Sequence, residues 1–162
     1  MYHLVYCSRA TAAFSAEQLT ELLVQARAFN QRHGLTGVLL YTLDRQFLQV
    51  LEGNKHAVRT LYHGHITADP RHVGCRVLSE GPWVQRNFPD WRMGFVMAGG
   101  FDAPTAPGPA QVRGLRHLLS LVAPAYPELG HLLQEFVREC DRVDQLAAPA
   151  EKLTSECLPF HS

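Results

Sequence analysis

The sequence has no excess of charge of either sign. Among its 162 residues, 15 are Lys or Arg and 15 are Asp or Glu, so the formal net charge is zero. A protein that binds the phosphate backbone of a nucleic acid needs a basic surface, and a neutral chain gives little support for one. We therefore expect no nucleic-acid partner.

Long apolar segments and paired cysteines are also scarce. The longest apolar run, residues 118–125, is broken by Ser120 and Pro124 and is much shorter than a membrane span. The cysteines form no CxxC pair, and no basic start leads into an apolar signal segment. These absences predict a cytoplasmic protein without a membrane anchor, whose cysteines need not be bridged. The cysteines are Cys7, Cys75, Cys140 and Cys157.

Several nucleotide and hydrolase motifs are missing. No GxGxxG follows the first predicted strand, and neither GxxxxGK[ST] nor GxSxG occurs. The nine histidines raise the question of a metal site, for which His63-x-His65 with Asp69 comes nearest to a ligand set. Because no complete set at a recognised spacing is present, we predict no metal site.

The length of 162 residues fits one globular domain of ordinary size better than two. We assign the domain to 1–98, a Gly- and Pro-rich linker to 99–110, a helical pair to 111–148 and a tail to 149–162. The apolar faces of the pair predict that it covers the second face of the sheet or dimerises. Those faces carry Val112, Leu115, Leu118, Leu119 and Val122, then Leu129, Leu132, Leu133, Phe136 and Val137.

The domain assigned to residues 1–98 has the sequence periodicities of strands and helices. Ser15 with Gln18 three residues later is a capping box that opens a helix, and Gly34 ends it. In the last predicted strand, Trp91 and Met93 share one face. The order β-α-β-β-α-β-β predicts an α+β, ferredoxin-like fold with a five-stranded mixed sheet and both helices on one face. Strands are predicted at 2–9, 35–42, 46–52, about 75–78 and 91–96, and helices after Ser15 and at 55–68.

Three uncharged polar side chains are predicted to point into the layer between the sheet and the helices. They are Tyr6 on the first strand, Gln49 on the third strand and Asn30 on the apolar stripe of the first helix. A hydrogen bond to nearby backbone explains any one of them. Together they would supply the placed polar contacts of a mostly apolar pocket for a flat heteroaromatic ligand.

Five motifs follow one another between residues 2 and 95. They are Tyr6-x-Ser8-x-Ala10, Asn30-x-x-x-Gly34-Leu35-Thr36-Gly37, Phe47-Leu48-Gln49-Val50-Leu51-Glu52-Gly53, Asp69-Pro70-Arg71-His72 and Trp91-Arg92-Met93-Gly94-Phe95. Each alone is weak, but in this order they resemble the BLUF domain, a blue-light sensor that uses flavin adenine dinucleotide (FAD). The predicted fold agrees with that of the family.

The resemblance implies a role for each of seven residues. Asn30 would bond the pyrimidine edge of the flavin ring, and Gln49 would lie between the flavin and Tyr6. Arg71 and Asp69 would serve the same polar edge or the side chain of the cofactor. Trp91 and Met93 would form the pair on the fifth strand that relays a change outward. Phe29 departs from the family, because relatives often carry Asn or His there, and this puts one polar contact to the cofactor in doubt.

The implied chemistry is reversible. An excited flavin is a strong one-electron oxidant, and Tyr6 is an oxidisable phenol that releases its proton with its electron. The Gln49 amide carries a donor and an acceptor on nearly the same shape, so the two can exchange places with little repacking. Electron and proton transfer from Tyr6 would reset Gln49, by rotation or by tautomerisation. That change would strengthen a hydrogen bond at the flavin C4 carbonyl, and the dark state would return thermally.

We therefore predict a blue-light photoreceptor, not an enzyme, that binds FAD, forms a homo-oligomer and signals to a downstream protein in trans. Two other interpretations stay open. One is a ferredoxin-like module that binds a small molecule without photochemistry. The other is an acylphosphatase-type enzyme, which needs an Arg-rich phosphate cradle beside an Asn, and no such loop follows the first predicted strand.

Overall fold

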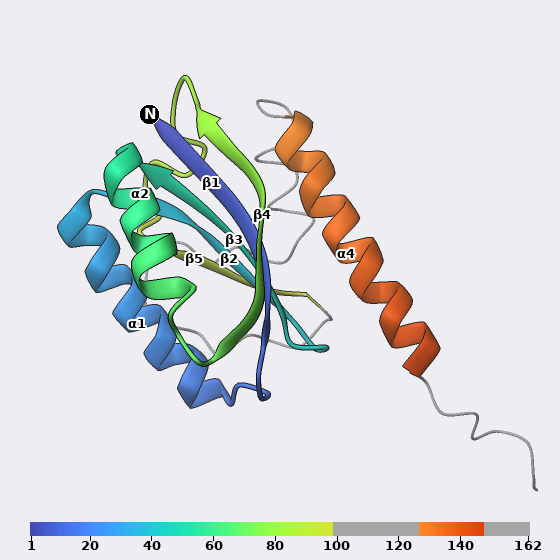
Figure 1. Ribbon diagram of the computed structural model, residues 1–162. Helices are drawn as coiled ribbons and strands as arrows, with labels where there is room; N and C mark the ends of the chain where they lie inside the picture. Colours follow the sequence, from blue (N-terminus) through green and yellow to red (C-terminus); the bar gives the residue numbers. More distant parts are fainter. Residues whose placement is uncertain (99–126, 148–162) are drawn as a thin grey trace, which may run out of the picture.

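A computed structural model describes residues 1–98 and 127–147 of the chain. In these residues five strands form one sheet, with helices on both of its faces (Figure 1). The elements in chain order are β1 (Tyr2–Ala10), α1 (Ala16–His33), β2 (Thr36–Thr42), β3 (Gln46–Gly53), α2 (Lys55–Leu61), the π-helix η1 (Tyr62–Ile66), β4 (His72–Pro82), β5 (Gly94–Ala98) and α4 (Pro127–Ala147).

The sheet has the strand order β4-β1-β3-β2-β5. β1 is antiparallel to β3 and β4, β2 is antiparallel to β3, and β5 joins β2 in parallel. β1 and β2 are therefore parallel to each other, as are β3 and β4, and each pair is connected through a helix on the same face of the sheet. This arrangement confirms the predicted ferredoxin-like α+β fold.

Each face of the sheet has its own apolar core. The core under α1 and α2 includes Leu4 of β1, Leu23 of α1 and Val58 of α2. The core on the opposite face includes Val50 of β3 and Leu133 of α4. Since alternate side chains of a strand point to opposite faces, β2 and β3 are buried along nearly their whole length.

The ends of α1 lie where the sequence places them. The Ser15 side chain accepts from the Gln18 backbone N–H, and the Gln18 side chain accepts from the Ser15 backbone N–H. At the other end, Gly34 has a φ of 64° and its N–H bonds the carbonyl of Asn30. A left-handed φ at that position favours glycine, so the predicted end is confirmed.

β2 and β3 form an antiparallel hairpin, close to the two strand ranges predicted at 35–42 and 46–52. Its turn contains Arg45 with a φ of 68°, and the Thr42 hydroxyl caps the turn by accepting from the N–H of Gln46. Close to the start of β2, a Cβ on Gly37 would lie only 1.9 Å from the Val50 carbonyl oxygen. Glycine is therefore required for β2 and β3 to pair at this point.

The second helix and the fourth strand differ from the predicted ranges. The α-helix ends at Leu61 and the chain continues as a π-helix to Ile66, closed by a bond from the N–H of Thr67 to the carbonyl of Tyr62. β4 runs from His72 to Pro82, much longer than the predicted 75–78. It is an edge strand with many exposed side chains, so the alternation that marks a half-buried strand is weak there.

The prediction that Trp91 and Met93 share one face of a strand is wrong. β5 begins only at Gly94, and the two side chains belong to opposite cores: Met93 packs under α1, and Trp91 packs on the face that α4 covers. The carbonyl of Trp91 accepts from the N–H of Gly37, which holds this irregular segment on β2 before pairing begins.

The last described helix covers the second face of the sheet, one of the two predicted alternatives. Leu129 and Leu133 of α4 are buried in the core there. The linker at 99–110, the first tail helix around Val112 to Val122 and the tail at 149–162 lie outside the described residues. Within 1–98 and 127–147, no helix is long and apolar enough to cross a membrane.

Candidate functional site

Two side chains from neighbouring strands meet on the face of the sheet that α1 covers. Tyr6 on β1 lies directly opposite Gln49 on β3, and its hydroxyl donates a hydrogen bond of 2.5 Å to Gln49 Oε1. The side chains are only 1% and 6% exposed. Burial raises the pKa of Tyr6 well above its usual 10.0, so the phenol holds its proton at neutral pH.

The other end of the Gln49 amide faces Met93. Gln49 Nε2 lies 3.5 Å from the Met93 sulfur, and a thioether is a weak acceptor. The amide is therefore held firmly through its oxygen by Tyr6 and only weakly through its nitrogen. Met93 therefore lies beside Gln49.

Asn30, on the last turn of α1, is 1% exposed. Its Nδ2 donates to the main-chain carbonyl of Arg92, whereas its Oδ1 is buried without a hydrogen-bond partner among the residues that the structure describes. A buried acceptor without a donor costs about 1–3 kcal/mol. This oxygen is therefore suited to accept a hydrogen bond from a bound ligand.

A cavity of about 440 Å³ lies where these side chains meet. Its volume is within the range of about 300–1,000 Å³ for pockets that hold small molecules. Its apolar lining is supplied by Leu22, Ala26, Phe29, Leu39, Leu61 and Ile66, and its polar lining includes Tyr6, Asn30, Gln49, Asp69, Arg71 and His72. Five of the seven residues predicted for the site thus line a single cavity between α1, the π-helix and the sheet.

Arg71 and Asp69 form an ion pair at the cavity. The Arg71 Nη2 lies 2.7 Å from Asp69 Oδ2, and its Nε donates to both carboxylate oxygens. Hydrogen bonding from Arg71 lowers the pKa of Asp69. Asp69 thus fixes the direction of the guanidinium, and because the Arg71 side chain is 43% exposed, it can still bond an acceptor on a ligand.

Phe29 is part of an aromatic group at the cavity. The His33 ring stacks on it with a centroid separation of 4.0 Å, and His65 meets it edge-on at 5.2 Å. Phe29 and His65 both line the cavity. The sequence marks Phe29 as a departure from the family but gives no signal for His65, because its direction depends on the π-helix.

His72 is a lining residue to which sequence reasoning assigned no role. Its Nδ1 lies 3.0 Å from the Ser8 hydroxyl of β1, and its ring packs on Phe47. Burial lowers the pKa of His72 below its usual 6.5. Since burial disfavours the charged form, His72 is a neutral hydrogen-bonding group in this wall.

Trp91 is the one predicted site residue that the structure places on the far side of the sheet from the cavity. Its ring stacks on Phe88 with a centroid separation of 5.1 Å, in the core that also contains Leu133. The two residues predicted to relay a signal are thus on opposite sides of the sheet, with Met93 at the cavity and Trp91 towards α4.

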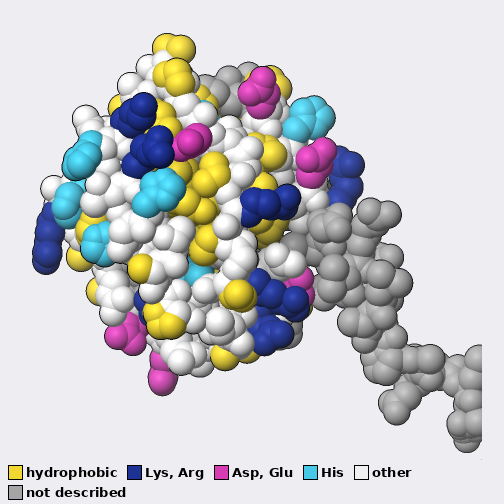
Figure 2. All heavy atoms as spheres, viewed as in Figure 1, with side chains coloured by type: hydrophobic (Ala, Val, Ile, Leu, Met, Phe, Trp, Pro, Cys, Tyr) yellow, Lys and Arg dark blue, Asp and Glu magenta, His cyan; other side chains and the backbone are white. Residues whose placement is uncertain are grey.

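His63, His65 and Asp69, the residues that come nearest to a metal-ligand set in the sequence, do not form a cluster. The two histidines are exposed on the π-helix. Figure 2 shows histidine side chains spread over the face on which α1 and α2 lie, separated by other side chains. In the part of the chain that the structure describes, no group of three or more potential metal ligands comes together.

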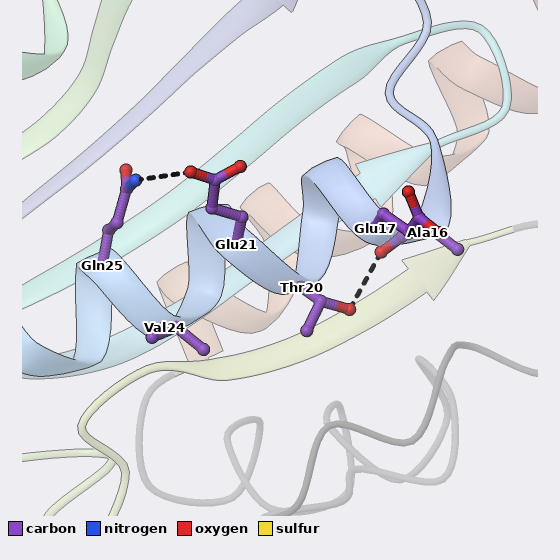
Figure 3. A pocket seen from close by; sticks show the side chains of 6 residues that line it. All are labelled: Ala16, Glu17, Thr20, Glu21, Val24 and Gln25. Carbon is purple, nitrogen blue, oxygen red and sulfur yellow. Dashed lines mark hydrogen bonds between the residues drawn. The ribbon is translucent and has the colours of Figure 1, made fainter.

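A second hollow lies on the outer face of α1, lined by Ala16, Glu17, Thr20, Glu21, Val24 and Gln25. Figure 3 shows two hydrogen bonds within the helix at this hollow: Gln25 donates to Glu21 at 3.2 Å, and the Thr20 hydroxyl donates to the Ala16 carbonyl at 2.9 Å. It is open to solvent and offers no buried unpaired group. The cavity between α1 and the sheet is therefore the better candidate site.

Sequence comparison places residues 1–94 in the family described as BLUF, sensors of blue light using FAD. The photoactivated adenylate cyclase subunit alpha of Euglena gracilis is 37% identical over 92 residues, which are 56% of this chain and 9% of that protein. The subunit beta of Euglena longa is 36% identical over 56% of this chain and 10% of its own length. This chain thus matches only about a tenth of the length of these curated relatives.

Solved structures agree with these matches. A dark-state structure of BlrB, titled a BLUF protein, has a TM-score of 0.56 and 28% identity over 81% of this chain and 82% of its own. Ground-state BlsA has a TM-score of 0.56 and 31% identity over 60% of this chain and 65% of its own. Klebsiella pneumoniae BlrP1 with FMN and cyclic diGMP has a TM-score of 0.69 and 27% identity over 87% of this chain and 35% of its own.

Proposed function

The chain belongs to the BLUF family of blue-light sensors that use FAD, and from that premise we propose that it is a flavin photoreceptor whose photoactive pair is Tyr6 and Gln49. The observation that carries this proposal is the buried hydrogen bond between these two side chains at the floor of an apolar cavity. A phenol and an amide in this arrangement can give up a proton and rearrange in response.

The groups around the cavity fit a flavin ring. The edge of isoalloxazine that carries two carbonyls and an N–H needs both donors and acceptors, and its remainder is flat and largely apolar. Asn30 offers the unpaired acceptor Oδ1, and the Gln49 amide offers both functions. Arg71, steadied by Asp69, offers a cation to the same edge or to the side chain of FAD. Leu22, Phe29 and similar side chains supply the apolar walls.

Tyr6 is the proton and electron donor in this proposal. A bound flavin supplies a strong one-electron oxidant when it absorbs blue light. Because the raised pKa of Tyr6 keeps its hydroxyl protonated, loss of an electron makes the phenol strongly acidic only at that moment. Its proton is already directed at Gln49 Oε1, 2.5 Å away, so the amide is the first group to respond.

Gln49 then has two arrangements of similar shape. In the first, Oε1 accepts from Tyr6 and Nε2 faces the Met93 sulfur. In the second, reached by rotation, Nε2 donates to the Tyr6 oxygen and Oε1 faces Met93; a tautomeric form of the amide has an equivalent effect. Either change alters what the amide presents to the cavity and to Met93, and the return in darkness is thermal.

The output of the proposed sensor is a shift between two packed states. Light biases one arrangement of Gln49 over the other, and Met93 is the neighbour that must respond to the change. We place the output on the opposite face of the sheet, where Trp91 and α4 pack, and propose that an altered surface there changes binding to another protein, in trans. A homo-oligomer would present this surface more than once.

An absorption spectrum of the purified protein tests the proposal. We expect a yellow protein whose spectrum moves slightly to longer wavelength under blue light and relaxes in darkness. Release of the pigment by denaturation, followed by chromatography, identifies it as FAD or another flavin. A colourless protein that binds some other small molecule would instead favour a ferredoxin-like module without photochemistry, and would refute the proposal.

A further inference from the structure

The carboxylate of Glu52 is fully buried, with an exposure of 0%, at the end of β3 and three residues after Gln49. Its Oε1 accepts from the backbone N–H and the side-chain Nδ2 of Asn87, at 2.6 and 2.9 Å. Its Oε2 accepts from the backbone N–H of Phe88 and the hydroxyl of Thr36, both at 3.1 Å. Four donors therefore converge on one buried carboxylate.

Arg86, which directly precedes Asn87, adds further hydrogen bonds around Glu52. Its guanidinium donates to the Thr36 hydroxyl at 2.7 Å, to the main-chain carbonyl of Glu52 at 3.1 Å and to the carbonyl of Gly34 at 2.7 Å. These bonds fasten residues 86–88 to β2, to β3 and to the end of α1. Glu52 and Arg86 thus hold residues 86–88 in place. We call the Glu52 carboxylate together with these three residues the Glu52 clasp.

Residues 88–93 contact the cores on both faces of the sheet. Phe88 stacks on Trp91 in the core under α4. The Trp91 ring lies so close to Gly94 that a Cβ there would be 2.5 Å from it. Met93, two residues after Trp91, contacts the Gln49 amide.

Side chains of α1 bond the backbone of the same segment. The carbonyl of Arg92 accepts from Asn30 Nδ2. The carbonyl of Met93 accepts from Arg27 Nε at 3.0 Å. Residues 88–93 are thus held at one end by Glu52 and at the other by α1, with Gln49 on one side and the α4 core on the other.

We propose that Glu52 is a positioning residue, which sets the segment 86–93 so that the Gln49–Met93 contact and the packing of Phe88 under α4 change together. The physical reason is that hydrogen bonds to two consecutive backbone N–H groups fix the direction of a segment, which apolar packing alone does not. Burying a carboxylate costs free energy unless hydrogen bonds satisfy it, so the loss of one of these bonds weakens the hold of Glu52 on the whole segment. The coupling in darkness stands without photochemistry, and only its response to light rests on the proposed function.

Glu52→Gln, studied in the full chain, loosens the clasp at constant size. An amide in place of the carboxylate presents an NH₂ group to at least one backbone N–H, so one bond is lost. Asn87→Ala is the matched control, because it removes the side-chain bond of Asn87 and leaves both backbone N–H groups bonded to Glu52.

Amide hydrogen exchange in darkness is the first measurement. For Glu52→Gln we expect exchange to speed up by about fivefold, the equivalent of one hydrogen bond, at Phe88, at Met93 and in the first turns of α4 together. Asn87→Ala should leave Met93 and α4 within twofold of the unmodified protein. Faster exchange at 86–88 alone in Glu52→Gln would overturn the proposal.

Illumination supplies the second measurement. Glu52→Gln retains Tyr6 and Gln49, so the colour shift should remain while the dark recovery rate changes by about threefold or more, because a loosened Met93 alters the barrier at Gln49. A recovery rate equal to that of Asn87→Ala would contradict the proposal. Absence of any colour shift in the unmodified protein would refute the proposed function and leave the dark exchange result to decide the coupling.

If Glu52→Gln does not fold, the unmodified protein still tests whether residues 88–93 are coupled to α4. Native-state exchange at rising urea concentration should show residues 88–93 and 127–133 opening as one cooperative unit. Separate openings with different urea dependence would show that the clasp orders only its own loop.

Discussion

The hydrogen bond between Tyr6 and Gln49 can be measured by a double-mutant cycle on the flavin-free protein. Tyr6→Phe leaves Gln49 Oε1 buried without its donor, and Gln49→Leu leaves the Tyr6 hydroxyl buried without its acceptor. Each single change should lower the free energy of unfolding by about 1–3 kcal/mol, the cost of a buried unpaired polar group. The double variant removes both polar groups and replaces them with apolar groups of similar shape, so we expect it to be little less stable than either single variant.

Urea unfolding provides the assay. For a protein of this size the slope is about 1–3 kcal/mol per M, so each single change should move the midpoint by roughly 1 M. Tyr41→Phe is the matched control: Tyr41 is another buried phenol, 4% exposed, and its hydroxyl accepts from the N–H of Phe14. Combined with Gln49→Leu, it should give additive losses.

The cycle has a clear contrary outcome. Coupling of about 1–3 kcal/mol between positions 6 and 49, against less than about 0.5 kcal/mol between 41 and 49, supports the buried bond as the organising contact of the site. Additive losses at positions 6 and 49 would mean that the bond has no net energetic weight, and the reasoning from its geometry would fail.

Three further predictions concern the walls of the site and the α4 face. Asn30→Leu removes the unpaired acceptor and should weaken flavin binding about tenfold, measured by fluorescence titration, and unchanged affinity would exclude Asn30 as a contact. The lowered pKa of His72 means that it stabilises the fold above pH 6.5 and less as the pH falls towards its folded pKa, so His72→Gln should flatten the acid side of the stability profile, and an equal slope would contradict this. Leu133→Ala should cost about 2–5 kcal/mol in urea unfolding without changing flavin content, since Leu133 lies on the far face of the sheet.

The elements with local signals were predictable from the sequence. The capping box of Ser15 and Gln18 and the left-handed Gly34 are decided by residues within one turn of each helix end, and α1 begins and ends there. The polar Asn30 falls on the apolar stripe by spacing alone, and the alternation of β3 puts Gln49 on the face of the sheet that α1 and α2 cover.

The features that depend on distant contacts were not predictable. The π-helix widens one turn after Leu61, which turns His65 towards the cavity, and no local motif marks that change. Trp91 and Met93 have strand spacing but precede β5, because the bond from Gly37 to the Trp91 carbonyl holds an irregular segment there.

The partners of Glu52 are also beyond sequence reasoning. They lie 16 and about 35 residues away, at Thr36 and at Asn87 and Phe88, and only the fold brings them to one carboxylate. A lone acidic residue at the end of a predicted strand gives no reason to expect four donors around it.

The most direct test of the photoactive pair compares light-minus-dark spectra of three proteins at equal flavin content: the unmodified chain, Tyr6→Phe and Gln49→Leu. We expect all three proteins to be yellow, the unmodified chain to show a reversible shift to longer wavelength, and neither variant to show such a shift. A shift of the same size in both variants would contradict the assignment of Tyr6 and Gln49 as the groups that respond to light.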